Sequence, residues 1–387
     1  MEIKGNFKTG CTIIFISLAL SLTGFSQTGD TLKNANVNTI GSIKDFTWLI
    51  QMLKDSSAKY KFPSFSIGIV KDGKVIFTGA VGWADRKKKI KATTESVYQI
   101  GSLTKTFTGN VLAHLVNEKI MSMDAEVAAY FPASVKFPVD STGRKITIKD
   151  IATHSSGLPR YPDNLDRVDG EPMMGYTKEQ LYKAIPTNLL ERNIGVRYIY
   201  SNYAYGILGT AMENATGKTY AELLQQYIFA PLGMKNSNGE MTEKIKRKLA
   251  TPYYDDNPTV ETKPWVMGSL TPHGGMFSTV TDLCRFIIHF MDTTQADVRT
   301  QQIPYFRITK RTTYGMGIFI SEVGAPINST IMEHGGDLDS YASDMKYFPE
   351  KKLGYIILSN GAGGRGLGNL FTTLEREIFK RYADKKF

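Results

Sequence analysis

A serine and a lysine three residues apart could form a nucleophile and the base that activates it. Ser102–Lys105 is such a pair, and the same Ser-x-x-Lys pattern recurs at Ser56–Lys59 and at Ser343–Lys346. Three occurrences are about what chance predicts for a chain rich in both residues. The pattern alone therefore predicts no site, and the expected context of each pair has to distinguish them.

The pair at Ser102 has the most favourable context. Apolar residues recur at four-residue steps after it, which predicts a helix with one buried face (Leu103, Phe107, Val111 and Leu115). In that helix Ser102 and Lys105 would share a face one turn apart, at an N-terminus whose free N–H groups stabilise negative charge. The pair at Ser56 falls at the fraying end of a helix. The pair at Ser343 falls in a strand, where positions i and i+3 face opposite sides.

A second segment, Tyr200-Ser201-Asn202, offers a phenol and an amide in one tripeptide. A tyrosine hydroxyl ordinarily has a pKa near 10, so it needs a nearby cation to act as a base at neutral pH. Lys105 could supply that cation. Asn202 could donate to a substrate carbonyl and also orient the lysine.

The third candidate segment is His-Gly-Gly, which occurs at 273–275 and at 334–336. The first copy leads into a predicted helix, so its glycines are expected in a loop. The second copy opens a strand-rich stretch, where glycines let a substrate backbone lie close to a strand edge. We therefore predict that His334, Gly335 and Gly336 bind substrate.

Together and in this order, these segments resemble the three motifs of the penicillin-recognising serine hydrolases. The order and spacing are most similar to class C β-lactamases, related D-alanyl-D-alanine carboxypeptidases and their esterase relatives. Four other stretches agree with this resemblance, which covers residues from about 42 to 380: THSSGLP at 153–159, IFAPLGMKNS at 228–237, GGMFSTVTDLCRF at 274–286 and YGMGI at 314–318.

The resemblance implies a role for each candidate. Ser102 would be the acylated nucleophile, Lys105 its activating partner, and Tyr200 the proton shuttle that later activates water. Asn202 would bind substrate by a hydrogen bond. The backbone N–H groups of Ser102 and Asp337 would form the oxyanion hole, in which losing one donor typically costs about 100- to 1,000-fold in rate.

The third motif departs from the family pattern, because β-lactamases carry Lys-Thr-Gly where this chain has His334-Gly335-Gly336. Histidine is largely neutral at pH 7, and glycine has no hydroxyl to offer a carboxylate. We therefore expect weak carboxylate recognition and weak or no turnover of β-lactams. An esterase, an amidase or peptidase, or an acyltransferase fits better. A D-alanyl-D-alanine carboxypeptidase or class C-like β-lactamase is the alternative, and a non-catalytic binding or sensor protein is the alternative of another class.

Several elements must assemble to hold these residues. Two β-rich runs flank Lys71-Asp72-Gly73 and predict a hairpin, and strand character returns at 314–323, 343–349 and 352–360. The region from about 120 to 300 is expected to be mainly helical. Strands from both ends of the chain predict an α/β (α+β) fold of the β-lactamase/transpeptidase type, with an antiparallel sheet flanked by helices. One domain, 42–387, would comprise an α/β lobe (42–100 and 305–387) and a helical lobe (101–304).

The N-terminus predicts secretion. Two lysines precede a twelve-residue apolar run, too short for the roughly 20 residues that span a bilayer, so residues 1–26 are expected to be a cleaved signal peptide. Residues 27–41 would be a linker. The protein is expected to cross the inner membrane of a bacterium and to be periplasmic or extracellular, with no stable membrane anchor after cleavage.

Composition narrows the function classes further. The chain has 387 residues, 42% of them apolar, and a formal net charge of +10. Its basic residues are scattered apart from the run at 85–91, so nucleic-acid binding is not expected. Signal cleavage would leave Cys284 as the one cysteine, which excludes an internal disulfide and favours a buried structural thiol. The expected partner is a small-molecule or peptide acyl substrate, and the sequence does not indicate the oligomeric state.

Three other signals are given structural interpretations. His154 beside Ser155 and Ser156 could form a rival nucleophile, but no G-x-S-x-G elbow surrounds them, so a bracing loop is predicted. Tyr198 and Tyr203 are expected to pack or to line the cleft. The glycine-rich GAGGRG at 361–366 precedes only about twenty residues, too few for a dinucleotide-binding unit. No cofactor and no metal are expected.

Overall fold

The computed structural model describes residues 36–39, 43–166, 173–254, 257–361 and 364–387. The predicted signal peptide, 1–26, lies outside the described residues. Part of the predicted linker is strand β1 (Asn36–Thr39), which pairs antiparallel with β3 (Lys74–Asp85) at the edge of the sheet.

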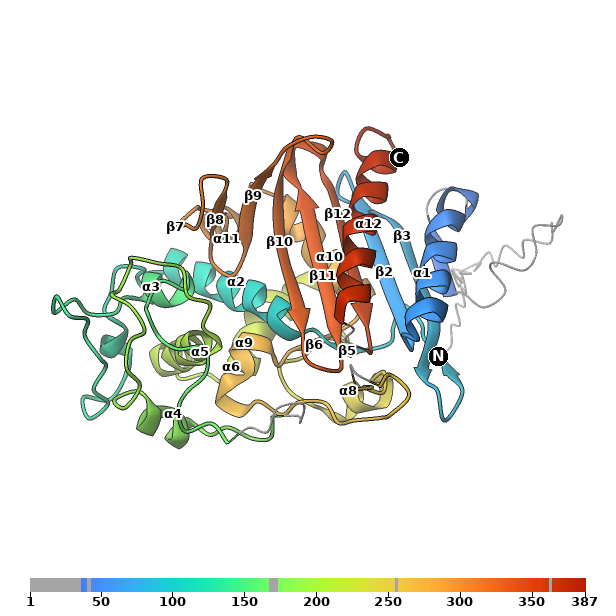
Figure 1. The fold of residues 1–387 in the computed structure, drawn as a ribbon. Helices are drawn as coiled ribbons and strands as arrows, with labels where there is room; N and C mark the ends of the chain where they lie inside the picture. The colour runs from blue at the N-terminus through green and yellow to red at the C-terminus, as the bar shows by residue number, and fades with distance from the viewer. Residues whose placement is uncertain (1–35, 40–42, 167–172, 255–256, 362–363) are drawn as a thin grey trace, which may run out of the picture.

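The centre of the molecule is an antiparallel sheet of ten strands (Figure 1). Its order is β1-β3-β2-β12-β11-β10-β9-β8-β7, with β4 beside β3. The N-terminal β2 pairs along its whole length with the C-terminal β12, from Lys71 opposite Leu353 to Phe65 opposite Ser359. This register confirms that both ends of the chain build one sheet. The remaining bounds are β2 (Ser64–Lys71), β4 (Ile90–Lys91), β7 (Phe306–Arg307), β8 (Thr312–Tyr314), β9 (Phe319–Val323), β10 (Ser329–Asp337), β11 (Ala342–Phe348) and β12 (Leu353–Ser359).

The predicted hairpin joins β2 to β3. Lys71 pairs with Lys74, and the two turn residues Asp72 and Gly73 have φ angles of 50° and 73°. Two successive positive φ angles define the type I′ turn that matches the twist of the strands, and Asp-Gly is one of its preferred sequences. The hairpin prediction is confirmed.

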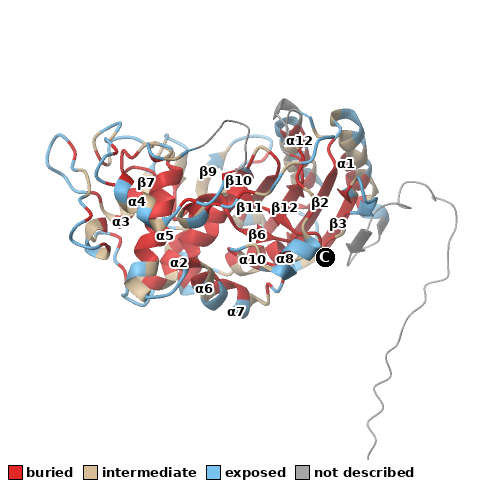
Figure 2. Ribbon diagram, turned by 90° about the horizontal axis from the view of Figure 1, so that it is seen from below, coloured by how far each residue is buried: buried red, intermediate tan, exposed pale blue. Residues whose placement is uncertain are grey.

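Two layers of helix cover the sheet. On one face lie α1 (Thr47–Tyr60) and α12 (Gly364–Tyr382), whose apolar residues form one core with the sheet. On the other face, α10 (Val280–Met291) packs on β2 and β12 and joins the sheet to the larger core of the helical region. Figure 2 shows the buried residues continuing from the sheet into those helices.

The helical region between the two groups of strands holds short helices joined by long loops, as predicted. Threonines cap several of them through a capping box, at Thr147, Thr177 and Thr219. Among the described residues, no helix combines the length and the apolar character needed to cross a bilayer. The helices are α2 (Thr104–Asn117), α3 (Ile148–Ala152), α4 (Lys178–Ala184), α5 (Asn202–Thr216), α6 (Tyr220–Leu224), α7 (Ala230–Leu232), α8 (Glu243–Lys248), α9 (Thr271–Gly274) and α11 (Ala296–Gln301).

One strand prediction is wrong in its extent. The stretch 314–323 contains the end of β8 and all of β9, and residues 315–318 between them are not strand. Gly317 has a φ of 73°, and its carbonyl accepts a hydrogen bond of 2.8 Å from the Thr106 hydroxyl on α2. The loop therefore leaves the sheet because it docks on the helix that follows Ser102.

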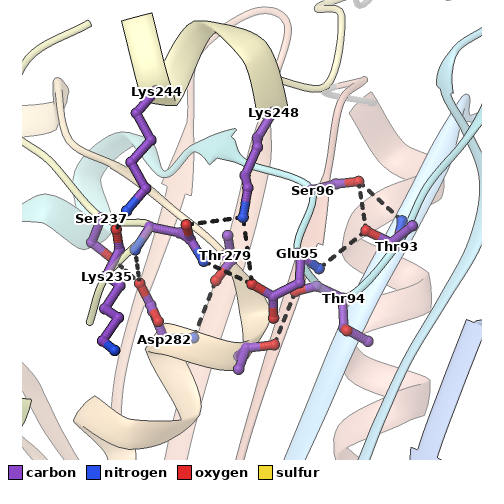
Figure 3. Close-up of polar contacts among 12 residues, drawn as sticks. Thr93, Thr94, Glu95, Ser96, Lys235, Ser237, Lys244, Lys248, Thr279 and Asp282 are labelled. Carbon is purple, nitrogen blue, oxygen red and sulfur yellow. Dashed lines mark hydrogen bonds and ion pairs between the residues drawn. The ribbon is translucent and has the colours of Figure 1, made fainter. Parts of the chain in front are cut away.

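The chain before Ser102 is held by polar contacts with the helical region (Figure 3). Glu95 accepts a 2.7 Å hydrogen bond from the Asn236 amide and faces Lys248 of α8 at 3.9 Å. The Thr94 carbonyl accepts from Thr281 at the start of α10. A short sheet of β5 (Tyr98–Gln99) and β6 (Phe277–Ser278) continues this anchoring up to the serine.

Candidate active site

Ser102 and Lys105 lie at the start of α2, where the sequence predicts them. Ser102 is in a single 3₁₀ turn, Gly101–Leu103, which leads directly into α2. The Lys105 Nζ lies 3.2 Å from the Ser102 Oγ. The pair at Ser343–Lys346 lies in β11 and faces opposite sides, as predicted, because Ser343 donates to the Ile100 carbonyl and Lys346 pairs with Glu375 on α12.

The Lys105 amine is fully buried and has three partners. Its Nζ lies 2.8 Å from the Asn202 Oδ1 and 2.7 Å from the His273 carbonyl oxygen, besides the Ser102 hydroxyl. A neutral amine has two N–H donors and one lone pair. Asn202 and His273 present oxygens that can only accept, so they match the two donors. The lone pair is then left for the remaining partner, the Ser102 hydroxyl, which can donate.

The surroundings favour this neutral amine. Burial lowers the pKa of Lys105 well below its ordinary value, and the Arg160 cation lowers it further. A neutral amine 3.2 Å from a hydroxyl can accept its proton.

Tyr200 reaches the same serine from the other side. Its hydroxyl interacts with the Ser102 side chain, and its ring lies under the Lys105 amine, whose Nζ is 4.6 Å from the ring centroid. Burial raises the pKa of Tyr200, while Ser102 and Arg160 lower it to a smaller extent. Lys105, the cation expected to favour ionisation of Tyr200, is not among the groups that lower this pKa, and burial favours the neutral phenol. In its neutral form Tyr200 can donate a proton.

The second His-Gly-Gly lies near the end of β10, as predicted, on an open strand edge. β9 pairs with β10 from Ser329 to Glu333, whereas the pairing with β11 continues to Asp337. His334 is buried, and its imidazole contacts the Gly335 carbonyl of its own strand at 2.7 Å and the Tyr314 hydroxyl of β8 at 3.4 Å. Burial, and then Lys105, lower the pKa of His334 to about 3, which favours the neutral ring.

Close backbone contact joins the first and third motifs. A Cβ added at Gly101 would lie 2.8 Å from the Asp337 nitrogen, and one added at Gly336 would lie 2.0 Å from the Ile100 carbonyl oxygen. Gly101 also has a φ of 54°, which favours glycine. This close approach brings the Asp337 N–H beside the turn that carries Ser102.

Three residues at this site were not predicted from the sequence. His273 belongs to the rejected His-Gly-Gly, yet its carbonyl holds Lys105. Arg160 lies beside Tyr200, with its Cζ 5.6 Å from the ring centroid. Neither contact has a sequence signal, because one uses a backbone carbonyl and the other depends on the path of a loop.

His154 is the third of these residues. Its ring packs against that of Tyr200, with centroids 4.4 Å apart, and its Nδ1 accepts a hydrogen bond of 3.0 Å from the Ser201 N–H. Ser155 instead contacts Thr153 and Asp150. His154 therefore does not activate a serine beside it, and the predicted bracing loop is also one wall of the site.

The other candidate residues have structural positions. Cys284 is buried in α10, and desolvation raises the pKa of its thiol to about 12. Tyr203 is buried, and Tyr198 packs on His154 and Tyr314. Within the described part of the chain, no group of three or more His, Cys, Asp or Glu side chains is arranged to hold a metal ion.

Comparisons with known proteins agree with this geometry. A family model described as Beta-lactamase matches residues 49–376. The chain is 26% identical over 309 residues to protein flp of Staphylococcus aureus, and 29% identical over 310 residues to the D-alanyl-D-alanine-carboxypeptidase/endopeptidase AmpH of Escherichia coli. The matches cover 78% and 75% of this chain. They cover 60% of flp and 77% of AmpH, so the chain spans less than two thirds of the length of the staphylococcal relative.

Solved structures share the fold. The octameric penicillin-binding protein homologue from Pyrococcus abyssi has a TM-score of 0.75 at 24% identity, covering 89% of this chain and 79% of that one. A class C β-lactamase from Rhodobacter sphaeroides has a TM-score of 0.70 at 20% identity, covering 84% and 98%. These likenesses confirm the predicted fold class, an antiparallel sheet flanked by helices with a mainly helical insert.

Proposed function

Because the chain belongs to the β-lactamase family of serine hydrolases, we propose that it cleaves ester or amide bonds through a covalent acyl-enzyme on Ser102. The observation that carries this proposal is the coordination of the Lys105 amine. Two acceptor oxygens, on Asn202 and His273, leave its lone pair for the Ser102 hydroxyl.

The proposed acylation step follows from these contacts. The Ser102 Oγ attacks the substrate carbonyl carbon while its proton passes to the Lys105 Nζ. The N–H groups of Ser102 and Asp337 stabilise the resulting oxyanion. The neutral Tyr200 phenol gives its proton to the leaving group as the tetrahedral intermediate collapses, and the protonated Lys105 gives up its proton to restore the phenol.

Deacylation reverses the roles. A water molecule attacks the acyl carbon, and its proton passes to the neutral Lys105 amine, directly or by way of the Tyr200 hydroxyl, which accepts one proton as it gives up another. The protonated Lys105 then returns a proton to the Ser102 oxygen as that oxygen leaves, which restores the hydroxyl and the neutral amine. An alcohol or amine could replace that water, in which case the product is a transferred acyl group. The proposed activity therefore includes acyl transfer.

A D-alanyl-D-alanine carboxypeptidase is the second candidate activity, favoured by the similarity to AmpH.

We also propose that residues 1–26 direct secretion into the periplasm or the extracellular space. N-terminal sequencing of the protein recovered from cells tests the proposed secretion, since the mature protein should begin near Gln27 rather than at Met1.

Labelling with a fluorophosphonate probe and hydrolysis of short-chain p-nitrophenyl esters test the enzyme. Ser102→Ala should abolish labelling and lower the rate by roughly 10⁴-fold or more. Ser56→Ala changes the serine of another Ser-x-x-Lys sequence, so it should behave as wild type. Labelling that persists in Ser102→Ala would place the nucleophile elsewhere, and a folded wild type that is neither labelled nor active would favour a binding protein.

A further inference from the structure

We infer that His154 is a positioning residue for Tyr200, whose phenol it holds where the leaving group of the substrate receives its proton. The inference goes beyond the proposed function but rests on it, because Tyr200 is the proton donor assigned there. His154 takes no part in the proton transfer itself, so its effect on the reaction should appear only through Tyr200.

His154 contacts the segment that carries the phenol at three consecutive residues. Its carbonyl accepts a hydrogen bond of 2.7 Å from the Ile199 N–H, and its ring Nδ1 accepts one of 3.0 Å from the Ser201 N–H. Between these two bonds, its ring packs against the Tyr200 ring with the centroids 4.4 Å apart. One residue therefore fixes the backbone on both sides of Tyr200 and contacts the ring itself.

His154 is itself held in place from several sides. It is fully buried, and the centroids of three further aromatic rings lie 5.0 to 5.4 Å from that of its imidazole: Tyr198, Tyr205 and Tyr314. The Tyr205 hydroxyl of α5 donates a hydrogen bond of 2.8 Å to the Ala152 carbonyl at the end of α3. The chain that precedes His154 is therefore tied to the helix that follows Tyr200, so the two contacting segments are fixed to the same helix.

The hydrogen bond from Ser201 defines the protonation state of His154. A backbone N–H can only donate, so Nδ1 must accept, and the proton of the neutral imidazole lies on Nε2. Burial, and then Lys105 and His334, lower the pKa of His154 well below its ordinary value, which favours this neutral form. Residue 154 also has a φ of 58°, a left-handed conformation that is uncommon for residues other than glycine but accessible to asparagine.

Losing this acceptor would loosen the segment that carries the phenol. Ser201 is fully buried, so without the imidazole its N–H would be left without a hydrogen bond. Ser201 also caps α5, where its hydroxyl accepts a hydrogen bond of 2.9 Å from the Ala204 N–H. Movement of Ser201 would displace Tyr200 relative to Ser102, and a misplacement of about 1 Å can cost about 100-fold in rate.

Dependence on the leaving group tests the inference. Ethyl butyrate releases a strongly basic alkoxide unless that group is protonated, whereas the nitrophenolate of p-nitrophenyl butyrate leaves without a proton. Tyr200→Phe should lower kcat/KM by about 100-fold or more for the ethyl ester and by less than about tenfold for the nitrophenyl ester. His154→Gln, whose amide extends past the position of Nδ1, should lower the two values by about 10- to 100-fold and by less than about threefold. His154→Asn keeps an acceptor near that position and should retain most of the activity on both esters.

A double variant separates positioning from packing. In the Tyr200→Phe background, His154→Gln should cause no further selective loss on ethyl butyrate, because the phenol that it positions is absent. His289→Gln replaces a histidine whose ring contacts Asp297, and it should leave the ratio of the two rates at the wild-type value. A thermal unfolding curve verifies that each variant is folded, and His154→Ala replaces the glutamine variant if that one is not.

Each outcome supports or overturns the inference. Equal losses on both esters in His154→Gln, or a selective loss that persists undiminished in the Tyr200→Phe background, would overturn it and leave the proposed function intact. A wild type that cleaves only the nitrophenyl ester, or a Tyr200→Phe variant without leaving-group dependence, would remove the proposed proton donor and this inference together. Fluorophosphonate labelling of Ser102 tests the nucleophile separately.

Discussion

Of the three lysines that follow a serine by three residues, two are largely buried, and the fold gives these two opposite environments. Lys105 on α2 has no carboxylate among its hydrogen-bond partners, and burial lowers its pKa well below the ordinary value. Lys346 on β11 is also mostly buried, but the carboxylates of Asp344, Glu333 and Glu375 outweigh its burial and raise its pKa. The same tetrapeptide pattern places one lysine among neutral oxygens and the other in a cluster of ion pairs.

The difference shows that the oxygens around a buried amine determine how readily it loses its proton. Amide and carbonyl oxygens satisfy N–H donors without compensating a full charge, so the amine gives up its proton readily. Carboxylates compensate the charge and hold the proton. A buried lysine with neutral acceptors should therefore be tested for catalysis, and one with carboxylates should be tested for stability.

Replacing the base should have the largest effect. Lys105→Arg keeps a cation that cannot lose its proton at any accessible pH, so it should lower kcat for p-nitrophenyl esters by about 1,000-fold. Lys59→Arg, in the Ser-x-x-Lys sequence of α1, is the matched control and should keep full activity. A thermal unfolding curve for each variant verifies that the loss is not one of folding. Activity within tenfold of wild type would show that Lys105 is not the base.

Replacing Lys346 should lower stability and not activity. Lys346→Met leaves three carboxylates without their shared cation, which should lower the free energy of unfolding by about 3 kcal/mol. The activity of the folded variant should stay within about threefold of wild type, because Lys346 faces α12 and not Ser102. Urea unfolding at pH 7 measures the first quantity and ester hydrolysis the second. An unchanged unfolding midpoint would contradict the assigned role.

Giving Lys105 a carboxylate neighbour, as Lys346 has, sharpens the comparison. Asn202→Asp places a carboxylate 2.8 Å from Lys105 with almost no change in shape. The carboxylate should stabilise the protonated amine and lower activity at pH 7 by about 10- to 100-fold. Because the base must be neutral, the rising limb of the pH–kcat/KM profile should move to higher pH, and activity should recover in part above pH 9. A reduced rate with an unmoved limb would mean that Asn202 acts on the substrate alone.

Much of this site could be predicted because its residues are contiguous in sequence. Helical spacing brings Ser102 and Lys105 together within one turn, and Tyr200 and Asn202 share a tripeptide. The sheet could be predicted too, because β2 and β3 meet at an Asp-Gly turn and the C-terminal part of the chain contains further strand-like segments that join the same sheet.

The missed parts depend on tertiary contacts. The His273 carbonyl reaches Lys105 only because α9 packs beside α2, and any residue type would supply that oxygen. Arg160 is placed by hydrogen bonds between its own backbone and α5, about forty residues away. The sequence also does not report how strongly burial raises the pKa of the Tyr200 phenol.

The smallest expected effect concerns the acid beside Lys346. Desolvation raises the pKa of Asp344 from 3.8 to about 6, although Lys346 opposes the shift. Between these values the folded carboxyl binds a proton that the unfolded one has lost, so the free energy of unfolding should fall as pH rises from about 4 to 6. This contribution should be about 2 kcal/mol.

Asp344→Asn removes that titration and keeps an oxygen that can accept the 2.8 Å hydrogen bond from Tyr355. Urea unfolding of wild type and variant between pH 4 and 7 measures the difference, in which all other titrating groups cancel. The variant should lose stability relative to wild type at pH 4 and regain it by pH 7, because the wild type must then ionise a desolvated carboxyl. Parallel curves would mean that Lys346 already holds Asp344 ionised throughout, so that the cluster is a permanent ion pair. In that case the contrast with the neutral partners of Lys105 would be even greater.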